Sequence, residues 1–90
     1  MISVIVPTWN EADQLPACLR SIGVHRAGVE IIVADGNSTD DTVALATAVG
    51  IKVVFSPVRQ RAAQLNLAAG LARGDVLLFL HADTRLPYRW

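Results

Sequence analysis

Residues 29–34 read Val-Glu-Ile-Ile-Val-Ala, and the turn-forming pair Asp35-Gly36 follows at once. A short, almost continuous run of apolar, mostly β-branched residues that ends at a turn is typical of a strand buried on both faces. Three other runs have the same character: residues 2–6, which end at Pro7; residues 51–55, which end at Ser56-Pro57; and residues 76–80, which end at His81. Runs of this kind predict a central parallel sheet.

The segments between these runs have helical spacing. Their apolar residues recur at intervals of three and four: Leu15, Cys18, Leu19 and Ile22; then Val43, Leu45, Ala46 and Val49; then Ala62, Leu65, Ala69, Leu71 and Ala72. We predict Asp13 as the N-cap of the first helix, with Pro16 in its first turn, and Gly50 as the end of the second. The alternation predicts an α/β fold: a Rossmann-like parallel sheet of about four strands with three right-handed crossover helices.

Composition limits the classes of protein to which the chain can belong. Its 90 residues suffice for one small domain, and 52% hydrophobic with 18% charged residues indicates a folded chain. Eight Lys and Arg balance eight Asp and Glu, which disfavours a nucleic-acid-binding module. The single cysteine, Cys18, rules out a disulfide or cysteine-based zinc framework within the chain and fits a reducing, cytoplasmic setting.

The two ends of the sequence also carry expectations. Met1 leads directly into apolar sequence without a basic region, and no apolar run approaches the ~20 residues of a membrane span, so neither a signal peptide nor a transmembrane segment is expected. The sequence stops at Pro87-Tyr88-Arg89-Trp90, soon after the fourth predicted strand. We expect either a domain cut before its second half or a short chain that covers its last strand by self-association.

Polar residues gather where the predicted strands end, which is where parallel α/β sheets bind ligands. They are Thr8, Trp9, Asn10 and Glu11; Asp35, Gly36, Asn37, Ser38 and Asp40; His81, Asp83 and Thr84; and, in the third crossover, Arg59, Arg61, Gln64 and Asn66. Turn and cap chemistry explains Gly36 and the polar residues after it. The same turn and cap chemistry does not explain why Trp9 lies in a strand-end loop, or why the fourth apolar strand ends in His81-Ala82-Asp83.

Two common nucleotide motifs are missing, and the lone thiol lies in an apolar pattern. No G-x-G-x-x-G follows the first strand, which argues against a dinucleotide site, and no Walker A sequence occurs, which excludes P-loop phosphoryl transfer. Cys18 lies on an apolar helical stripe, and this position favours a core residue over a nucleophile.

Three stretches, Val4–Glu11, Ile32–Thr42 and Leu78–Thr84, together resemble the nucleotide-sugar-binding half of family 2 glycosyltransferases with the GT-A fold. The resemblance covers essentially the whole chain, with each motif at the end of a predicted strand. It implies the sheet order 3-2-1-4. It also implies that residues 1–90 form the donor-binding part of a GT-A domain, truncated before its acceptor half.

The resemblance assigns candidate nucleotide-binding residues. The family's first strand-end loop lies against a uracil-type base, and it corresponds to Pro7, Thr8, Trp9, Asn10 and Glu11. Trp9 would then supply a stacking surface, with a plain core aromatic as the alternative. Asp35 corresponds to the acid that contacts the base or ribose, since a carboxylate accepts hydrogen bonds from a base N–H or a sugar hydroxyl. Its alternative is an Asx-turn residue ahead of Gly36.

The third crossover and the fourth strand end complete the comparison. Arg61 could face the diphosphate, with a solvated helix-face arginine as the alternative. Asn66 is more often a structural hydrogen-bonder than a ligand contact. The family's Asp-x-Asp element falls on His81-Ala82-Asp83, with histidine in place of the first acid, and this resembles a subset that carries His-Ala-Asp-Thr.

Asp83 is therefore the expected ligand of Mg²⁺ or Mn²⁺, because such ions keep several non-protein ligands. His81 is either a second metal ligand or, as we favour, a hydrogen-bonding partner of ribose or phosphate. Imidazole suits Mn²⁺ better than Mg²⁺.

The resemblance implies a function. The chain would hold a nucleoside-diphosphate sugar, with UDP as the favoured type, for transfer of the sugar to an acceptor hydroxyl. The catalytic base is expected outside these residues, so the chain alone would bind without catalysing. The implied location is the cytoplasm, with peripheral attachment to the inner membrane face as an option.

Two other functions stay open. One is a nucleotide-binding module without activity of its own. The other is a phosphohydrolase of the haloacid-dehalogenase type, whose Asp-x-Asp-x-Thr motif is loosely echoed at Asp35–Thr39 and at His81–Asp83. Neither copy has both acids, which weighs against this reading.

Overall fold

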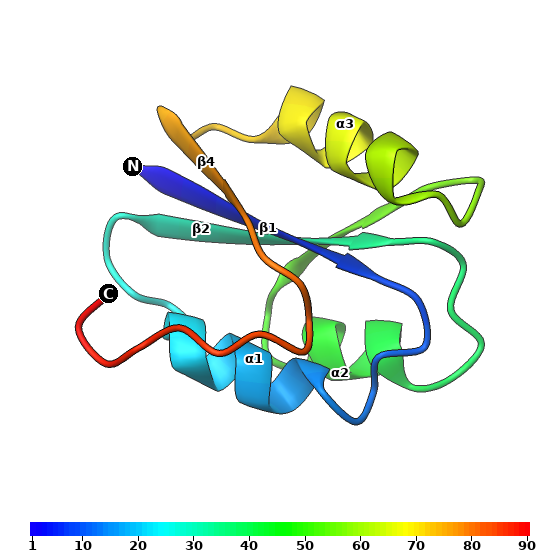
Figure 1. Ribbon diagram of the computed structural model, residues 1–90, viewed down its shortest axis with the longest axis horizontal. Helices are drawn as coiled ribbons and strands as arrows, with labels where there is room; N and C mark the ends of the chain where they lie inside the picture. Colours follow the sequence, from blue (N-terminus) through cyan, green and yellow to red (C-terminus); the bar gives the residue numbers. More distant parts are fainter.

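The computed structural model describes residues 1–90 as a parallel sheet with helices on both faces (Figure 1). The elements follow one another in the order β1 (Ile2–Thr8), α1 (Leu15–Ile22), β2 (Val29–Asp35), α2 (Thr42–Ala48), β3 (Lys52–Phe55), α3 (Arg61–Leu71) and β4 (Val76–Phe79). All strand pairs are parallel and the sheet order is β3-β2-β1-β4. The predicted α/β class and the order 3-2-1-4 are confirmed.

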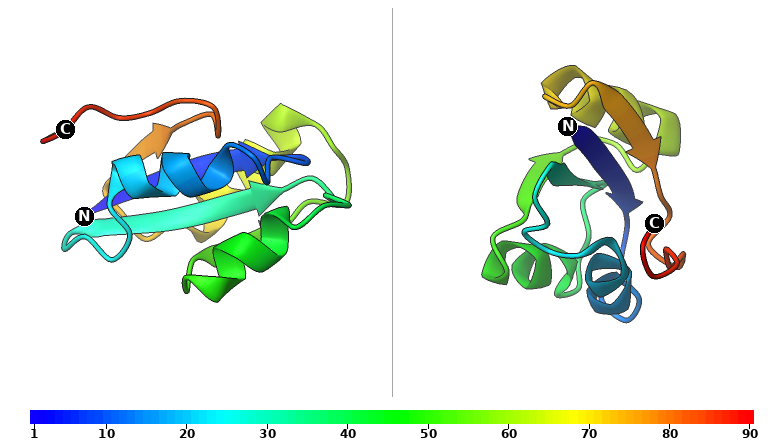
Figure 2. Two further views of the ribbon diagram at one scale, coloured as in Figure 1. Left: turned by 90° about the horizontal axis from the view of Figure 1, so that it is seen from below. Right: turned by 90° about the vertical axis from the view of Figure 1, so that its left-hand side faces the viewer.

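The two central strands separate two apolar clusters. Val4, Val6, Ile31 and Val33 point to the side of α1 and α2, whereas Ile5, Ile32 and Ala34 point to the side of α3. Figure 2 shows α3 on one face of the sheet and the other two helices on the opposite face. This is why neither strand alternates with polar residues, since both of its faces are buried.

β1 does not end at Pro7 as predicted but continues to Thr8, and Pro7 pairs in register with Ala34. The backbone of Ile5 bonds toward β4, through the amide of Leu80, and the carbonyl of Thr8 bonds toward β2. Because successive residues of a strand face alternate neighbours, Pro7 faces the β4 side, beyond the last β1–β4 pair. No ladder bond is therefore lost by its missing N–H.

The helices depart from the predicted faces in several places. Gln14, not Asp13, precedes α1, and no side chain caps that helix. In α2 the buried residues are Thr42 and Ala46, while Leu45 and Val49 are exposed. In α3 the buried residues are Gln64 and Ala68, with Ala62 and Leu71 exposed. The prediction that Gly50 ends α2 is confirmed, because it follows that helix at φ +79°.

At the amino end of the sheet, a polar cluster joins β1, β2 and the turn before β4. The Glu30 carboxylate accepts hydrogen bonds from the Ser3 hydroxyl at 2.7 Å and from the Arg73 amide at 2.9 Å. The Gly74 amide donates to the Ser3 hydroxyl at 2.8 Å. The hydrogen bonds from Arg73 and Ser3 lower the pKa of Glu30 below its usual value.

The last ten residues return along α1 from the carboxyl edge of the sheet toward its amino end (Figure 1). The Leu86 amide donates to the Ser21 hydroxyl at 3.0 Å, and the Trp90 indole donates to the Ile22 carbonyl at 3.0 Å. No helix of the chain combines the length and the apolar character that crossing a bilayer requires.

Candidate functional site

Two loops at the carboxyl edge, after β1 and after β2, are tied together through polar side chains. The Asn10 amide donates to the Ser38 hydroxyl at 2.8 Å, and the Asn10 side-chain oxygen accepts from the Thr39 amide at 2.8 Å. Asn10 and Asn37 have φ values of +52° and +72°, a left-handed conformation that asparagine tolerates better than most residues. The two loops are therefore joined into one rim at the carboxyl edge.

Asp35 lies beneath this rim and is 1% exposed. Its Oδ1 accepts hydrogen bonds from the hydroxyls of Thr8 (2.7 Å) and Ser38 (2.6 Å), and its Oδ2 accepts from the Ser38 amide (2.8 Å). The structure thus places Asp35 and Thr8, both candidate ligand residues, in a buried network that sets the shape of the rim. A buried carboxylate with both oxygens engaged does not suit the exposed nucleophile of a haloacid-dehalogenase-type phosphohydrolase.

Asp40 lies just before Asp41, the N-cap of α2, and its carboxylate holds the first residue of that helix. Its carboxylate accepts from the Thr42 amide at 2.9 Å and from the Thr42 hydroxyl, and these bonds lower the pKa of Asp40. The same carboxylate accepts from the Ala12 amide at 3.2 Å, and the Thr42 hydroxyl oxygen accepts from the Glu11 amide at 2.9 Å. The loop after β1 is therefore anchored to the start of α2.

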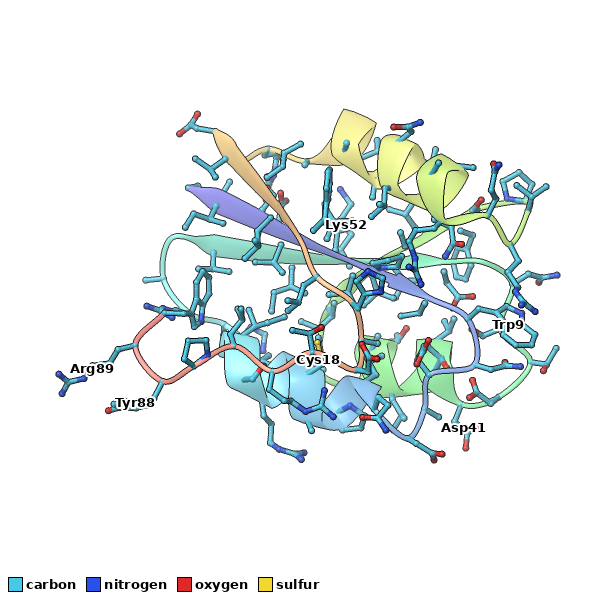
Figure 3. The ribbon with its side chains drawn as sticks, viewed as in Figure 1. Trp9, Cys18, Asp41, Lys52, Tyr88 and Arg89 are labelled. Carbon is cyan, nitrogen blue, oxygen red and sulfur yellow. The ribbon has the colours of Figure 1, made fainter.

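An open cleft of about 230 Å³ lies beside this rim, between the end of β1 and the start of α3. Its lining residues are Pro7, Thr8, Trp9, Glu11, Arg59, Arg61 and Gln64. The Trp9 ring is 37% exposed, and the Arg59 guanidinium lies over it, 3.7 Å from the ring centroid. Figure 3 shows Trp9 at the carboxyl edge, opposite the end that carries Tyr88 and Arg89. The cleft combines a flat aromatic wall with two arginines.

Gln64 closes the floor of the cleft. Its Nε2 donates to the carbonyl oxygens of Thr8 (2.9 Å) and Ala34 (2.8 Å), so it bridges β1 and β2 where the two strands end. The side chain is buried, although the apolar spacing of α3 did not include Gln64 in the predicted inward face. Ala68 is buried beside Gln64, and Leu65, Ala69 and Ala72 pack against the same core, so α3 meets the sheet through both apolar packing and the Gln64 hydrogen bonds.

Charged side chains continue the site from the cleft toward the end of β4. The Arg61 Nη1 and the His81 Nε2 are 3.4 Å apart, and since arginine has only donors, this histidine nitrogen is the acceptor. Burial raises the pKa of Glu11, and the negative charges of Asp83 and Asp40 raise it further, while Arg61 and His81 lower it. The structure thus places four predicted site residues close enough to influence one another electrostatically: Glu11, Arg61, His81 and Asp83.

The carboxyl edge holds no group of three or more histidine, cysteine or acidic side chains that could hold a metal ion by themselves. His81 and Asp83 are both exposed at the end of β4. Such a sparse donor set fits Mg²⁺ or Mn²⁺ only if phosphate oxygens and waters complete the coordination, as is common for these ions.

Cys18 is a core residue, as its position on the apolar stripe predicted. It is buried in the cluster beneath α1, and burial raises the pKa of its thiol to about 11. Its sulfur lies 3.7 Å from the His81 carbonyl oxygen. A buried thiol that stays protonated at neutral pH is a poor nucleophile.

The structure gathers most, but not all, of the predicted residues around the cleft. Arg59 and Gln64 line it, although the sequence offered no reason to rank them above Arg61. Asn66 is exposed on α3 and does not line the cleft. Asn10 shapes the rim rather than the cleft. One sequence signal could have found Gln64. It lies four residues before Ala68, so the two residues share one face of the helix.

A parallel α/β sheet with an arginine- and tryptophan-lined cleft at its carboxyl edge is typical of nucleotide-binding α/β domains. Residues 3–90 match the sequence profile of Glycosyl transferase family 2. The chain belongs to this family, and the three-motif resemblance is confirmed.

Curated relatives agree with the family assignment. A PGL/p-HBAD biosynthesis glycosyltransferase of Mycobacterium bovis is 38% identical over 93 residues, which cover 96% of this chain and 36% of the relative. A glycosyltransferase of Rickettsia felis is 38% identical over 85 residues, which cover 94% of this chain and 29% of the relative. The chain spans about a third of the length of these relatives.

Solved structures share the fold. Glucosyl-3-phosphoglycerate synthase from Mycobacterium tuberculosis, in complex with Mn²⁺, UDP and phosphoglyceric acid, superposes with a TM-score of 0.82 at 34% identity. That match covers 97% of this chain and 34% of the synthase. S. aureus TarS 1-349 matches with a TM-score of 0.82 at 27% identity, over 91% of this chain and 27% of TarS. These neighbours support the GT-A assignment.

Proposed function

We propose that this chain is the nucleotide-sugar-binding part of a glycosyltransferase. It would hold a nucleoside-diphosphate sugar, of the UDP type, for transfer of the sugar to an acceptor hydroxyl. The observation that carries the proposal is the cleft at the carboxyl edge, which joins the Trp9 wall to two arginines. The UDP complexes of the synthase from M. tuberculosis support the choice of nucleotide. The location in the proposal is the cytoplasm, with peripheral attachment to the inner membrane face as an option.

Different cleft residues would contact different parts of the ligand. Pro7 and Trp9 present apolar surface to a flat base, while Arg61 presents a planar, permanently charged fork that matches phosphate oxygens. As the sugar departs, negative charge grows on the leaving diphosphate, and a fixed guanidinium stabilises it. We place the base that deprotonates the acceptor outside residues 1–90. In the proposal, the chain alone therefore binds the donor but does not transfer the sugar.

Asp83 is the chain's candidate for holding a divalent metal, with His81 beside it. When bound, Mg²⁺ or Mn²⁺ would neutralise charge on the two phosphates. Asp83 is the anionic oxygen donor that β4 delivers to this edge, and hard cations prefer such donors. The His81 Nε2 already faces Arg61, which suits a role in binding phosphate or ribose more than a role as a metal ligand.

The matched variants Asp83→Asn and His81→Ala test these roles. We expect Asp83→Asn to remove the increase in UDP affinity that Mn²⁺ produces, because the end of β4 then offers the ion no anionic oxygen. His81→Ala is expected to weaken UDP binding several-fold with and without Mn²⁺. The measurement is titration calorimetry of UDP against each variant and the original chain, with Mn²⁺ and with chelator. An effect of Mn²⁺ that survives Asp83→Asn but not His81→Ala would reverse the two assignments.

A module that binds a nucleotide without catalysis remains the second candidate function. Hydrolysis or transfer of a labelled UDP-sugar, measured on residues 1–90 and on a longer protein that contains them, separates the two. Turnover only in the longer protein supports the glycosyltransferase proposal. Binding without turnover in both supports the inactive module, and no UDP binding in either contradicts both.

We also propose that β4 mediates self-association of this chain. β4 is an edge strand, and its Val76, Leu77 and Phe79 are 57%, 40% and 50% exposed. An uncovered apolar edge strand pairs readily with another chain. We expect light scattering to show a mass that rises with concentration, and Leu77→Lys to lower it. Leu71→Lys, which changes an exposed leucine on α3, is the control. A monomer at several hundred micromolar would contradict the proposal.

A further inference from the structure

Asp35 is poorly placed to recognise a base in this structure. It does not line the cleft, it is 1% exposed, and its two oxygens already accept three hydrogen bonds. A ligand could use this carboxylate only by replacing the Thr8 or Ser38 partner. The recognising group is therefore better sought among the residues that line the cleft.

Gln64 offers a free acceptor there. Both partners of its Nε2 are carbonyl oxygens, so the amide nitrogen must face them and the orientation of the group is fixed. No hydrogen bond reaches the other end of the amide, Oε1. Since no fully buried side-chain nitrogen or oxygen lacks a partner, Oε1 is not completely enclosed, and because Gln64 lines the cleft we infer that Oε1 faces it. The floor of the cleft thus presents one neutral acceptor of defined direction.

The position of this acceptor is also confined. A Cβ on Gly36 would lie 3.0 Å from both Cδ and Oε1 of Gln64, so the amide packs directly against the Gly36 backbone. The same Cβ would lie 3.1 Å from Nε2, which makes the two carbonyl bonds. An amide held in this way cannot rotate to offer its nitrogen to a ligand without breaking two hydrogen bonds.

We propose that Oε1 of Gln64 accepts a hydrogen bond from the ring N–H of the nucleobase and so selects the base. This inference rests on the proposed function and adds a specificity-determining residue to it. Uracil carries a ring N–H at its pairing edge, whereas cytosine carries an acceptor at the same place. A base with an acceptor there would set two lone pairs against each other and leave both atoms unpaired, which sites of this kind reject.

The test compares three ligands: UDP, CDP and UDP methylated at N3 of the uracil, which removes the N–H. Affinities are measured by titration calorimetry on the 90-residue chain and on three variants. Gln64→Met keeps the length of the side chain but removes the acceptor. Gln60→Met is the matched control, because Gln60 is exposed and makes no capping bond. Asp35→Asn tests the alternative residue.

We expect the original chain to prefer UDP over both other ligands by about 10-fold or more, the worth of one well-placed hydrogen bond. Gln64→Met should bring this ratio close to one, whereas Gln60→Met and Asp35→Asn should leave it unchanged. A purely structural role of Gln64 would weaken all three ligands equally and keep the ratio. A preference that survives Gln64→Met, or one that Asp35→Asn abolishes, would overturn the proposal.

Gln64→Met also removes the donor to two carbonyls, so its folding must be checked by circular dichroism. If it does not fold, the side-chain amide resonances of Gln64 in the original chain decide the matter by NMR. They should shift with UDP and much less with the N3-methylated ligand, and equal shifts would contradict the inference. Absence of any UDP binding would instead contradict the proposed function.

Discussion

Replacing Asp35 by alanine is expected to lower the free energy of unfolding by about 3 kcal/mol and to abolish UDP binding. The substitution removes three hydrogen bonds from a carboxylate that is 1% exposed. It also leaves the Ser38 amide and the Thr8 hydroxyl without their partner, and each such buried group costs about 1–3 kcal/mol. Because a domain of this size has only about 5–13 kcal/mol of stability, the rim would lose its defined shape.

Asp35→Asn is the matched control, because hydroxyls can accept as well as donate. The new amide can donate to the hydroxyls of Thr8 and Ser38, while its oxygen accepts from the Ser38 amide. We therefore expect a loss of about 1 kcal/mol, the scale of one weakened hydrogen bond. Urea denaturation and UDP calorimetry measure both variants. Equal stability of Asp35→Ala and the original chain would show that the network does not hold the rim.

Gly74→Ala is expected to lower the free energy of unfolding by about 2–3 kcal/mol, as overpacking does. A Cβ at this position would lie 2.5 Å from the Ser3 hydroxyl oxygen, 2.7 Å from the Ser3 amide nitrogen and 2.8 Å from the Met1 carbonyl oxygen. Two of these atoms belong to the backbone at the start of β1, so rotating a side chain cannot relieve the clash. The turn before β4 would have to move away, and the pairing of β4 with β1 would weaken.

Gly70→Ala provides the comparison at a glycine without neighbours. A Cβ on Gly70, within α3, would meet no atom within 4 Å, and alanine is the better helix former. This variant is expected to gain about 0.5–1 kcal/mol. Urea midpoints at an unchanged slope give both values. A Gly74→Ala protein as stable as the Gly70→Ala protein would contradict the packing argument.

The sequence predicted the sheet well, because the burial of a central strand is recorded in its own composition. The runs at residues 2–6 and 29–34 are apolar at nearly every position, and each position faces one of two helical layers. The predicted end of β1 at Pro7 is wrong, because proline does not stop every strand. Whether proline interrupts a strand depends on which neighbour its missing N–H faces, and that is known only once the sheet order is known.

The inward face of α3 was predicted only in part, for a related reason. Apolar spacing places Leu65 and Ala69 inward, and both pack against the core beneath α3. It does not predict that Gln64 is buried beside them, where its amide donates to the carbonyls of Thr8 and Ala34. The sequence of a helix does not show that carbonyls at the ends of nearby strands need a hydrogen-bond donor, so the role of Gln64 could not be predicted from it. The stacking of Arg59 on Trp9 escaped prediction too, because the two residues are 50 positions apart.

The contact between Arg59 and Trp9 affects which ligands the cleft can bind tightly. A flat ring that settles on the same face of Trp9 exchanges one partner for another, since Arg59 already covers it at 3.7 Å. The gain from stacking is then the difference between two contacts of similar strength. The displaced guanidinium, however, is released beside Arg61 in the same cleft. A ligand that carries both a flat ring and negative charge can use the released arginine, whereas a flat ring without charge only competes with it.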